Sequence, residues 1–322
     1  SALSALDNGT TAYTYNTAVG YAAGGAVTTG IKNTLIGGLA GDALTEGENN
    51  VAIGYNALTS ETLGERSVAI GNKALQNQNN TSETNTYNVA IGYDAGNAMT
   101  TGLNNTIIGG LAGDAITSAI NNTAIGYHSL GSNLIGDNNT ALGFKALEDF
   151  VADTDGHGNN TAIGASAMLN ASTGTENTAI GMNAMGVGVV TGDFNVALGF
   201  NTGYALTSGQ RNTLIGTTAG DALTSGDYNV AVGMDALGAE DAHGRNTALG
   251  FQTLKVQNAG ADAYNTAVGY QAGVTMTTGV NNTLMGALAG DALTTGFSNI
   301  YLGKDAGGSS TIGNSNVAIG EA

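Results

Sequence analysis

The fold of this chain is decided by a five-residue motif that first reads Asn16-Thr17-Ala18-Val19-Gly20. The motif occurs 18 times in 322 residues, and 13 of the 17 intervals between copies are 17 residues long. Copies begin at residues 16, 33, 50, 67, 88, 105, 122, 139, 160, 177, 195, 212, 229, 246, 265, 282, 299 and 316. Because the repeats run from end to end, we expect one repeat domain, 1–322, rather than two globular domains.

The five motif positions, here called columns one to five, have distinct compositions. Column one is almost always Asn, column two is β-branched, column four is Val, Ile, Leu or Met, and column five is always Gly. Side chains alternate along a strand, so columns two and four share one face and column three takes the other. Since column four is never polar, we expect columns two and four to face the interior. A 17-residue repeat predicts an all-β, parallel β-solenoid of about 18 coils.

Columns one and five are expected to shape the turns. Gly in column five suits a bend with positive φ or a close backbone approach. Asn in column one tolerates turn geometry, and stacked Asn side chains predict a hydrogen-bonded ladder. In the first three coils these structural turn residues are Asn16, Asn33, Asn50, Gly20, Gly37 and Gly54.

Column three predicts an assembly. It is Ala in 13 copies and never charged, although a solvent-facing strand position is normally polar. We therefore expect several chains to pack along this apolar stripe, while a monomer with a harmless Ala stripe is the alternative. The expected interface residues are Ala18, Leu35, Ala52, Ala69, Ala90, Ile107, Ala124, Leu214 and Leu284.

Composition excludes several classes of protein. With 8 Lys and Arg against 25 Asp and Glu, the net charge is −17, which argues against a nucleic-acid partner. No apolar stretch reaches about 18 residues, so membrane insertion is not expected. The absence of Cys excludes disulfides and cysteine zinc sites, and the absence of Pro excludes collagen.

The repeat resembles two known kinds of fibre repeat. Segments such as NVAIGY at 50–55 and NTAVGY at 265–270 are similar to the head repeats of trimeric autotransporter adhesins (YadA-like heads). They also resemble repeats that precede the self-cleaving chaperone domain of phage-type tail fibres. The resemblance implies a left-handed parallel β-roll, a homotrimer, and an extracellular (cell-surface or secreted) or virion location. The common coil here is longer than the usual adhesin-head repeat, which leaves the host type open.

A longer period lies above the coil. Column nine alternates between pairs of Gly coils and pairs of Leu coils, interrupted by one extra pair at Met168 and Met185, a pattern consistent with duplication of a four-coil block. The loops at 77–85 and 148–159 are expected to project and to contact a receptor or neighbour. The incomplete coils at 1–3 and 316–322 are complementary, which predicts either an excerpt from a longer fibre or head-to-tail stacking.

Catalytic and metal sites find little support. The three histidines, His128, His157 and His243, have no recurring ligand set around them, so we expect solvated loops, no metal site and no cofactor. No Ser/His/Asp triad or carboxylate dyad stands out, and the chain is not expected to be an enzyme. Acidic residues of the Ala-Gly-Asp-Ala segments suit turns better than Ca²⁺ sites. They are Asp42, Asp114, Asp221 and Asp291.

Aromatic residues recur in column six, directly after the Gly. They suit a sugar-stacking surface, but packing against neighbouring coils or subunits is the favoured interpretation. They are Tyr21, Tyr55, Tyr93, Tyr127, Phe144, Phe200, Phe251 and Tyr270.

Together these features predict a non-enzymatic, extracellular, structural and adhesive fibre. Its expected partners are further copies of itself, in a homotrimer with or without end-to-end stacking, and an unidentified surface receptor. The alternative is a phage tail-fibre segment that recognises a host surface. An ice-binding solenoid ranks low, because that activity needs an exposed Thr array and the column-two Thr residues are expected inside.

Overall fold

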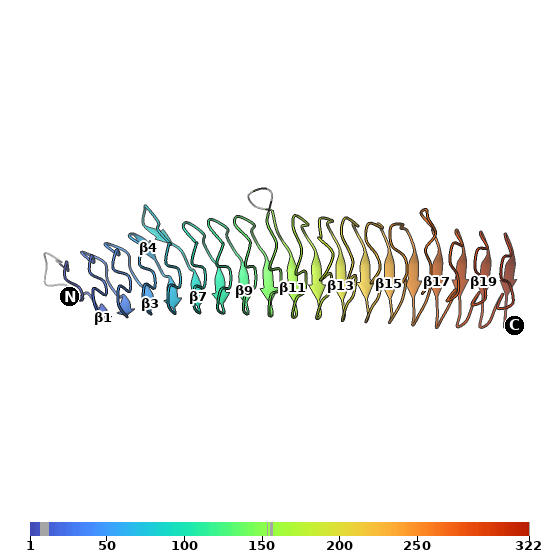
Figure 1. Ribbon diagram of the computed structural model, residues 1–322, viewed down its shortest axis with the longest axis horizontal. Helices are drawn as coiled ribbons and strands as arrows, with labels where there is room; N and C mark the ends of the chain where they lie inside the picture. Colours follow the sequence, from blue (N-terminus) through green and yellow to red (C-terminus); the bar gives the residue numbers. More distant parts are fainter. Residues whose placement is uncertain (7–12, 153, 155–156, 322) are drawn as a thin grey trace. The chain divides into compact units, whose positions relative to one another are not determined.

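The computed structural model describes residues 1–6, 13–152, 154 and 157–321. The chain divides into two compact units, Ser1–Asn160 and Thr161–Ala322, and each is a stack of β-solenoid coils (Figure 1). The prediction of an all-β parallel solenoid of about 18 coils is confirmed. In the described part of the chain no helix is long and apolar enough to cross a bilayer.

Each motif forms one three-residue strand. In the first unit the strands are β1 (Thr17–Val19), β2 (Thr34–Ile36), β3 (Val51–Ile53), β4 (Gly64–Glu65), β5 (Val68–Ile70), β6 (Thr84–Asn85), β7 (Val89–Ile91), β8 (Thr106–Ile108), β9 (Thr123–Ile125) and β10 (Thr140–Leu142). In the second they are β11 (Thr161–Ile163), β12 (Thr178–Ile180), β13 (Val196–Leu198), β14 (Thr213–Ile215), β15 (Val230–Val232), β16 (Thr247–Leu249), β17 (Thr266–Val268), β18 (Thr283–Met285), β19 (Ile300–Leu302) and β20 (Val317–Ile319).

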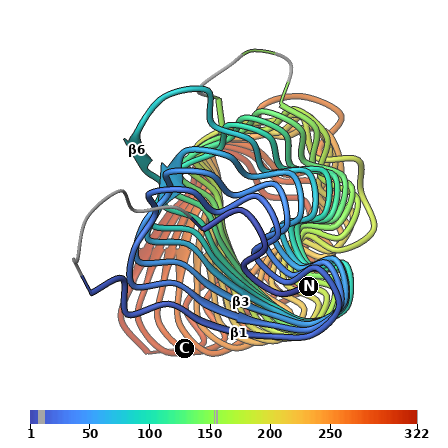
Figure 2. The ribbon, with the colours of Figure 1, turned by 90° about the vertical axis from the view of Figure 1, so that its left-hand side faces the viewer.

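Neighbouring strands pair in parallel, column against column. Leu35 of β2 lies opposite Ala52 of β3, for example, and Ile36 lies opposite Ile53. Outside the motif strands, β4 and β6 form a two-stranded parallel sheet of their own. Identical motif columns therefore stack along each unit, and Figure 2 shows the coils of the ribbon following one another in register.

Column one forms the predicted Asn ladder, and the ladder is buried. The backbone N–H of Asn33 donates to Oδ1 of Asn16 (2.8 Å), and Nδ2 of Asn33 donates to the carbonyl of Gly47 (2.9 Å). Asn50 repeats both bonds one coil later, to Asn33 and to Gly64. Each side-chain amide thus closes its own coil through Nδ2 and ties that coil to the following one through Oδ1, which satisfies backbone groups that burial would otherwise leave unpaired.

Column five meets both predicted requirements for Gly. All 18 glycines have φ between 128° and 148°, including 137° at Gly20, 138° at Gly37 and 139° at Gly54. A Cβ atom at any of these three positions would also clash with the backbone of the column-five Gly in the next coil. A residue with a side chain meets backbone strain and steric overlap together.

The expected assignment of the two strand faces is wrong. Column three points inward: Ala52 and Ile107 are fully buried within the single chain. Columns two and four point outward, as Val196 of column two (38 % exposed) and Leu142 of column four (42 % exposed) illustrate. The buried Ala of column eight, such as Ala57, lies in the same core as column three. The coil interior is therefore narrow, and the strand turns its smallest column inward because small side chains fit there.

Candidate functional site

The most extensive candidate site is the outward face of the motif strands. It consists of columns two and four, which carry Thr or a branched aliphatic residue beside Val, Ile, Leu or Met. No copy has a charged residue in either column. Several of its large apolar side chains are at least 37 % exposed: Val19, Ile36, Leu142, Val196, Leu198, Leu249, Met285, Ile300, Val317 and Ile319. An uncharged face with large exposed aliphatic side chains is a candidate surface for contact with another molecule.

The stripe predicted as the trimer interface cannot serve that purpose. The eight residues of the set that follow Ala18 have no exposed surface, and Ala18 is only partly exposed. They are Leu35, Ala52, Ala69, Ala90, Ile107, Ala124, Leu214 and Leu284. Sequence alternation grouped the columns correctly but assigned the wrong group to the core. The apolar surface available to a partner therefore belongs to columns two and four.

Four of the eight column-six aromatics stack in pairs between adjacent coils, in line with the favoured interpretation. Tyr127 and Phe144 have ring centroids 5.8 Å apart and an interplanar angle of 13°, and Phe251 and Tyr270 are stacked at 5.4 Å. About half of the surface of Tyr127 and Phe144 stays exposed. These rings pack on each other and still present their outer surface to solvent.

A second aromatic row, which we did not predict, runs through the residues that precede column one. In the second unit Phe194, Arg211, Tyr228, Arg245 and Tyr264 alternate along five successive coils. Each guanidinium lies over the rings on both sides, at 5.0 to 5.7 Å from the ring centroids. The sequence could have predicted this row, because Arg and aromatic residues recur directly before the Asn of column one. These cation–π contacts join neighbouring coils at the surface.

The four acidic residues of the Ala-Gly-Asp-Ala segments lie in turns, as predicted. Their carbonyls accept from the preceding coil: the N–H of Ala26 donates to Asp42 (2.9 Å), and the N–H of Ala205 donates to Asp221 (3.0 Å). Burial raises the pKa of Asp221. Each belongs to a different coil, so one ion cannot be shared among them.

Asp221 borders a pocket of about 270 Å³ that Asp235 and Lys255 also line. Asp235 accepts from the Thr218 hydroxyl (2.6 Å), from Nε2 of Gln252 (3.1 Å) and from Nζ of Lys255 (3.1 Å). Those interactions, led by the Thr218 hydrogen bond, lower the pKa of Asp235. The pocket thus holds two carboxyl groups whose environments shift their pKa values in opposite directions.

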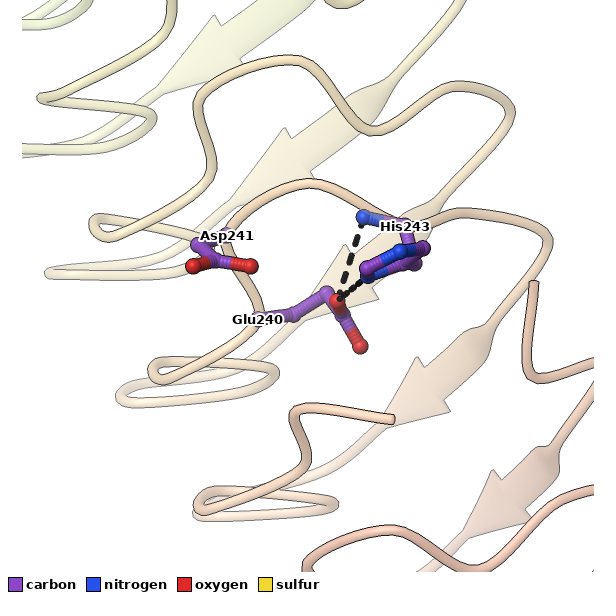
Figure 3. Close-up of side chains that lie close together, drawn as sticks. All are labelled: Glu240, Asp241 and His243. Carbon is purple, nitrogen blue, oxygen red and sulfur yellow. Dashed lines mark hydrogen bonds and ion pairs between the residues drawn. The ribbon is translucent and has the colours of Figure 1, made fainter. Parts of the chain in front are cut away.

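His128 and His243 each lie beside a carboxylate. Nδ1 of His128 is 3.4 Å from Oε1 of Glu148, and Nδ1 of His243 is 3.6 Å from Oε1 of Glu240. The carbonyl of His157 accepts from the N–H of Asp137 (3.1 Å). Glu240 is fully buried, a feature that its loop position did not predict. Figure 3 shows its carboxylate beside the imidazole of His243.

Burial raises the pKa of Glu240 to about 7, against the lowering effect of hydrogen bonds from the His243 and Ala259 backbones and of the His243 charge. The nearby Asp241 carboxylate raises it further. Glu240, Asp241 and His243 together form the one group in the described residues that holds three potential metal ligands close together.

The structure describes the two longer loops to different extents. The loop at 77–85 contains β6, which extends beyond the adjacent coils near β4 (Figures 1 and 2). Of the loop at 148–159, residues 153, 155 and 156 lie outside the described residues, while Phe150 is fully buried. The projection predicted for 77–85 is therefore confirmed for residues 81–85, whereas Gln78 and Asn80 are buried.

Comparison with protein-family models found no match, and comparison with curated protein sequences found none. The candidate surfaces of this solenoid are therefore interpreted from their own chemistry. The outward sheet face, the stacked aromatics and the Glu240 cluster are the three features that carry chemical information.

Proposed function

We propose that this protein is a non-enzymatic structural fibre in which three copies pack through the outward faces of their motif strands. The observation that carries the proposal is the uncharged apolar surface of columns two and four. A solvent-facing face of a parallel sheet is normally polar or covered, since exposed apolar area is costly in water. Burying Ile36, Leu142, Leu198 and their equivalents between chains removes that cost.

The proposed assembly is thus still a homotrimer, but its interface differs from the one expected from the sequence. Residues of columns two and four replace the column-three set at the contact between chains. Branched side chains that repeat at the strand spacing of about 4.8 Å can interdigitate with an identical row on each neighbour. Such an assembly suits an extracellular or virion fibre, because rows of buried aliphatic side chains and Asn ladders stiffen it along its length.

An adhesive role is proposed for surfaces that stay outside this interface. The loop at 77–85 and the half-exposed column-six aromatics offer polar groups and flat rings to a receptor. The same arrangement serves a surface adhesin and a tail-fibre segment equally well.

Sedimentation velocity on the full chain tests the proposal. We expect a single species with three times the 31.8 kDa mass of the chain. A monomer that stays monodisperse at high micromolar concentration contradicts the trimer, because its apolar face would then be permanently exposed.

Ice binding is a second candidate, and one observation favours it. Column two is Thr in 11 of 18 copies, and it lies on the outward face instead of the interior. The reason for ranking this function low is thereby removed, because a regular row of Thr hydroxyls and methyl groups now faces solvent. Thermal hysteresis of the monomeric chain measures it directly. A trimer without hysteresis supports the fibre, and a monomer with hysteresis supports ice binding.

A further inference from the structure

Two buried glutamates occupy equivalent places in two coils. Glu61 lies 11 residues after the column-one Asn50, and Glu240 lies 11 residues after Asn229; both side chains are fully buried. A buried carboxylate requires partners, since an unpaired charge in a low-dielectric interior is strongly unfavourable. The two sites differ in how they meet that requirement.

Glu61 is surrounded by donors from the chain itself. Its Oε1 accepts the N–H groups of Thr62 (3.0 Å), Gly64 (2.7 Å) and Asn80 (3.0 Å). Its Oε2 accepts from Nε2 of Gln78 (2.9 Å) and Nδ2 of Asn80 (2.9 Å). This carboxylate needs no further ligand.

Glu240 lacks the side-chain donors of that set. Ala259 stands where the other site has Asn80, and the amide of Gln257, the equivalent of Gln78, donates instead to the carbonyl of Gly279 (3.2 Å). The N–H of His243 reaches Oε1 at 3.2 Å. Oε2 is buried without a hydrogen-bond partner, so the chain satisfies this carboxylate less completely than that of Glu61.

Two neutral residues of the Glu61 site are replaced beside Glu240 by residues of types that can bind a metal ion. His243 stands where the Glu61 site has Gly64, and Asp241 stands where it has Thr62. Nδ1 of His243 is also buried without a hydrogen-bond partner, at 3.6 Å from Oε1 of Glu240. That distance is too long for a hydrogen bond. It is close to the separation of about 3.4 Å between two ligands of a tetrahedral ion with bonds of about 2.05 Å.

We propose that Glu240, Asp241 and His243 bind one divalent metal ion, with Zn²⁺ the best match. One carboxylate oxygen from each acid and one imidazole nitrogen lie within 4.8 Å of one another (Figure 3). An imidazole with two carboxylates suits Zn²⁺, whereas Ca²⁺ takes six to eight oxygen ligands. Asp241 is exposed, which gives the ion access from solvent, and a water molecule completes the tetrahedron.

The site is tested by titrating Zn²⁺ into the untagged full-length chain after removal of metal with a chelator. We expect calorimetry to give one ion per chain. The chain has three histidines, so its imidazole C–H signals in a proton NMR spectrum form a small set. Zn²⁺ should shift the signal of His243 and leave those of His128 and His157 in place. Absence of saturable binding, or a shift of another histidine alone, overturns the proposal.

Variants separate the site from general surface binding. His243→Gln and Asp241→Asn, on the partly exposed side of the cluster, should each weaken Zn²⁺ binding by at least about tenfold. His128→Gln is the matched control, because it removes an imidazole beside a carboxylate in another coil and should leave Zn²⁺ affinity unchanged. Equal affinities for His243→Gln and wild type, with the same circular dichroism spectrum, refute the proposal. Tighter binding of Ca²⁺ than of Zn²⁺ refutes it as well.

Discussion

The side chain of Leu35 fills the space that a side chain at Gly24 would need: a Cβ atom at Gly24 would lie 2.6 Å from Cδ1 of Leu35. Gly41 is related to the same leucine, with 2.9 Å to Cδ2. Leu214 repeats the arrangement with Gly203 and Gly220, at 2.9 Å in both cases. One large residue in column three therefore compensates for two glycines in column nine. This size complementarity gives a packing reason for the four-coil period.

Leu214→Ala should destabilise the second unit strongly. The substitution opens a cavity between Gly203 and Gly220, which have no side chains to fill it. Buried Leu→Ala changes cost about 2–5 kcal/mol. Urea denaturation followed by circular dichroism measures the effect. Leu198→Ala is the control, with both variants compared as dissociated single chains: it removes the same atoms from a side chain that is 43 % exposed there, and equal losses would contradict the assignment of faces.

Asn212→Ala should break one step of the Asn ladder. Its Nδ2 donates to the carbonyl of Gly226 (2.8 Å), and its Oδ1 accepts the N–H of Asn229 (2.9 Å). Both partners would be left buried and unsatisfied, at about 1–3 kcal/mol each. The midpoint of thermal unfolding should fall well below that of Asn170→Ala, where only an exposed bond to Val187 is lost. A similar midpoint for the two variants would show that the ladder contributes little.

Gly216→Ala should lower the free energy of unfolding by more than the addition of one methyl group would suggest. The residue has φ of 130°, and an added Cβ would lie 2.7 Å from the carbonyl oxygen of Gly233. Gly260→Ala is a control for strain alone, because Gly260 also has a positive φ of 69° but nothing within 4 Å. Backbone strain of this kind costs about 1–3 kcal/mol. In chemical denaturation, Gly216→Ala should therefore have a lower free energy of unfolding than Gly260→Ala. The reverse order would exclude close coil stacking as the reason for the glycine.

Charge on the outward sheet face should dissociate the proposed trimer. Leu198 and Leu249 are 43 % and 40 % exposed in the single chain, so the double variant Leu198→Lys with Leu249→Lys should keep its fold. Its sedimentation should change from trimer to monomer, because the ammonium groups would be buried without partners between chains. Ser208→Lys, on an exposed turn, serves as the control and should remain trimeric. A trimeric double variant would place the interface elsewhere.

Two neighbouring carboxyl groups should affect acid stability in opposite directions. The pKa of Asp235 is lower in the folded chain than in the unfolded chain, where it is about 3.9. The ionised carboxylate therefore stabilises the fold above the unfolded pKa, and this stabilisation is lost as pH falls through the folded pKa. Asp235→Asn should therefore lower the unfolding temperature at pH 7 and flatten its fall in acid. The raised pKa of Asp221 has the opposite sign, because the buried charge opposes folding above the folded pKa.

Asp221→Asn should accordingly raise the unfolding temperature at pH 7, and its advantage should vanish in acid. Calorimetric scans of wild type and both variants between pH 3 and 7 measure these differences. Parallel pH profiles for the two variants would contradict the opposite shifts.

Much of this architecture could be predicted from the sequence. The 17-residue interval determines one strand per coil and stacks like on like, so Asn16 meets Asn33 and Gly20 meets Gly37. The need for positive φ at Gly20 and for an amide at Asn16 follows from backbone chemistry that any stacked coil imposes. These properties depend on spacing and residue type alone.

Tertiary structure alone decided which strand face is inside. Alternation groups Thr34 with Ile36 against Leu35, but both groups contain large aliphatic residues and no charge, so hydrophobicity does not distinguish them. The rest of the coil, which fills the interior with residues such as Ala40, leaves room for a column that is mostly Ala. Likewise, Glu240 and His243 are neighbours in sequence, but only folding buries that carboxylate and removes it from water. A buried acid that keeps one oxygen without a hydrogen-bond partner distinguishes a candidate metal site from a solvated loop.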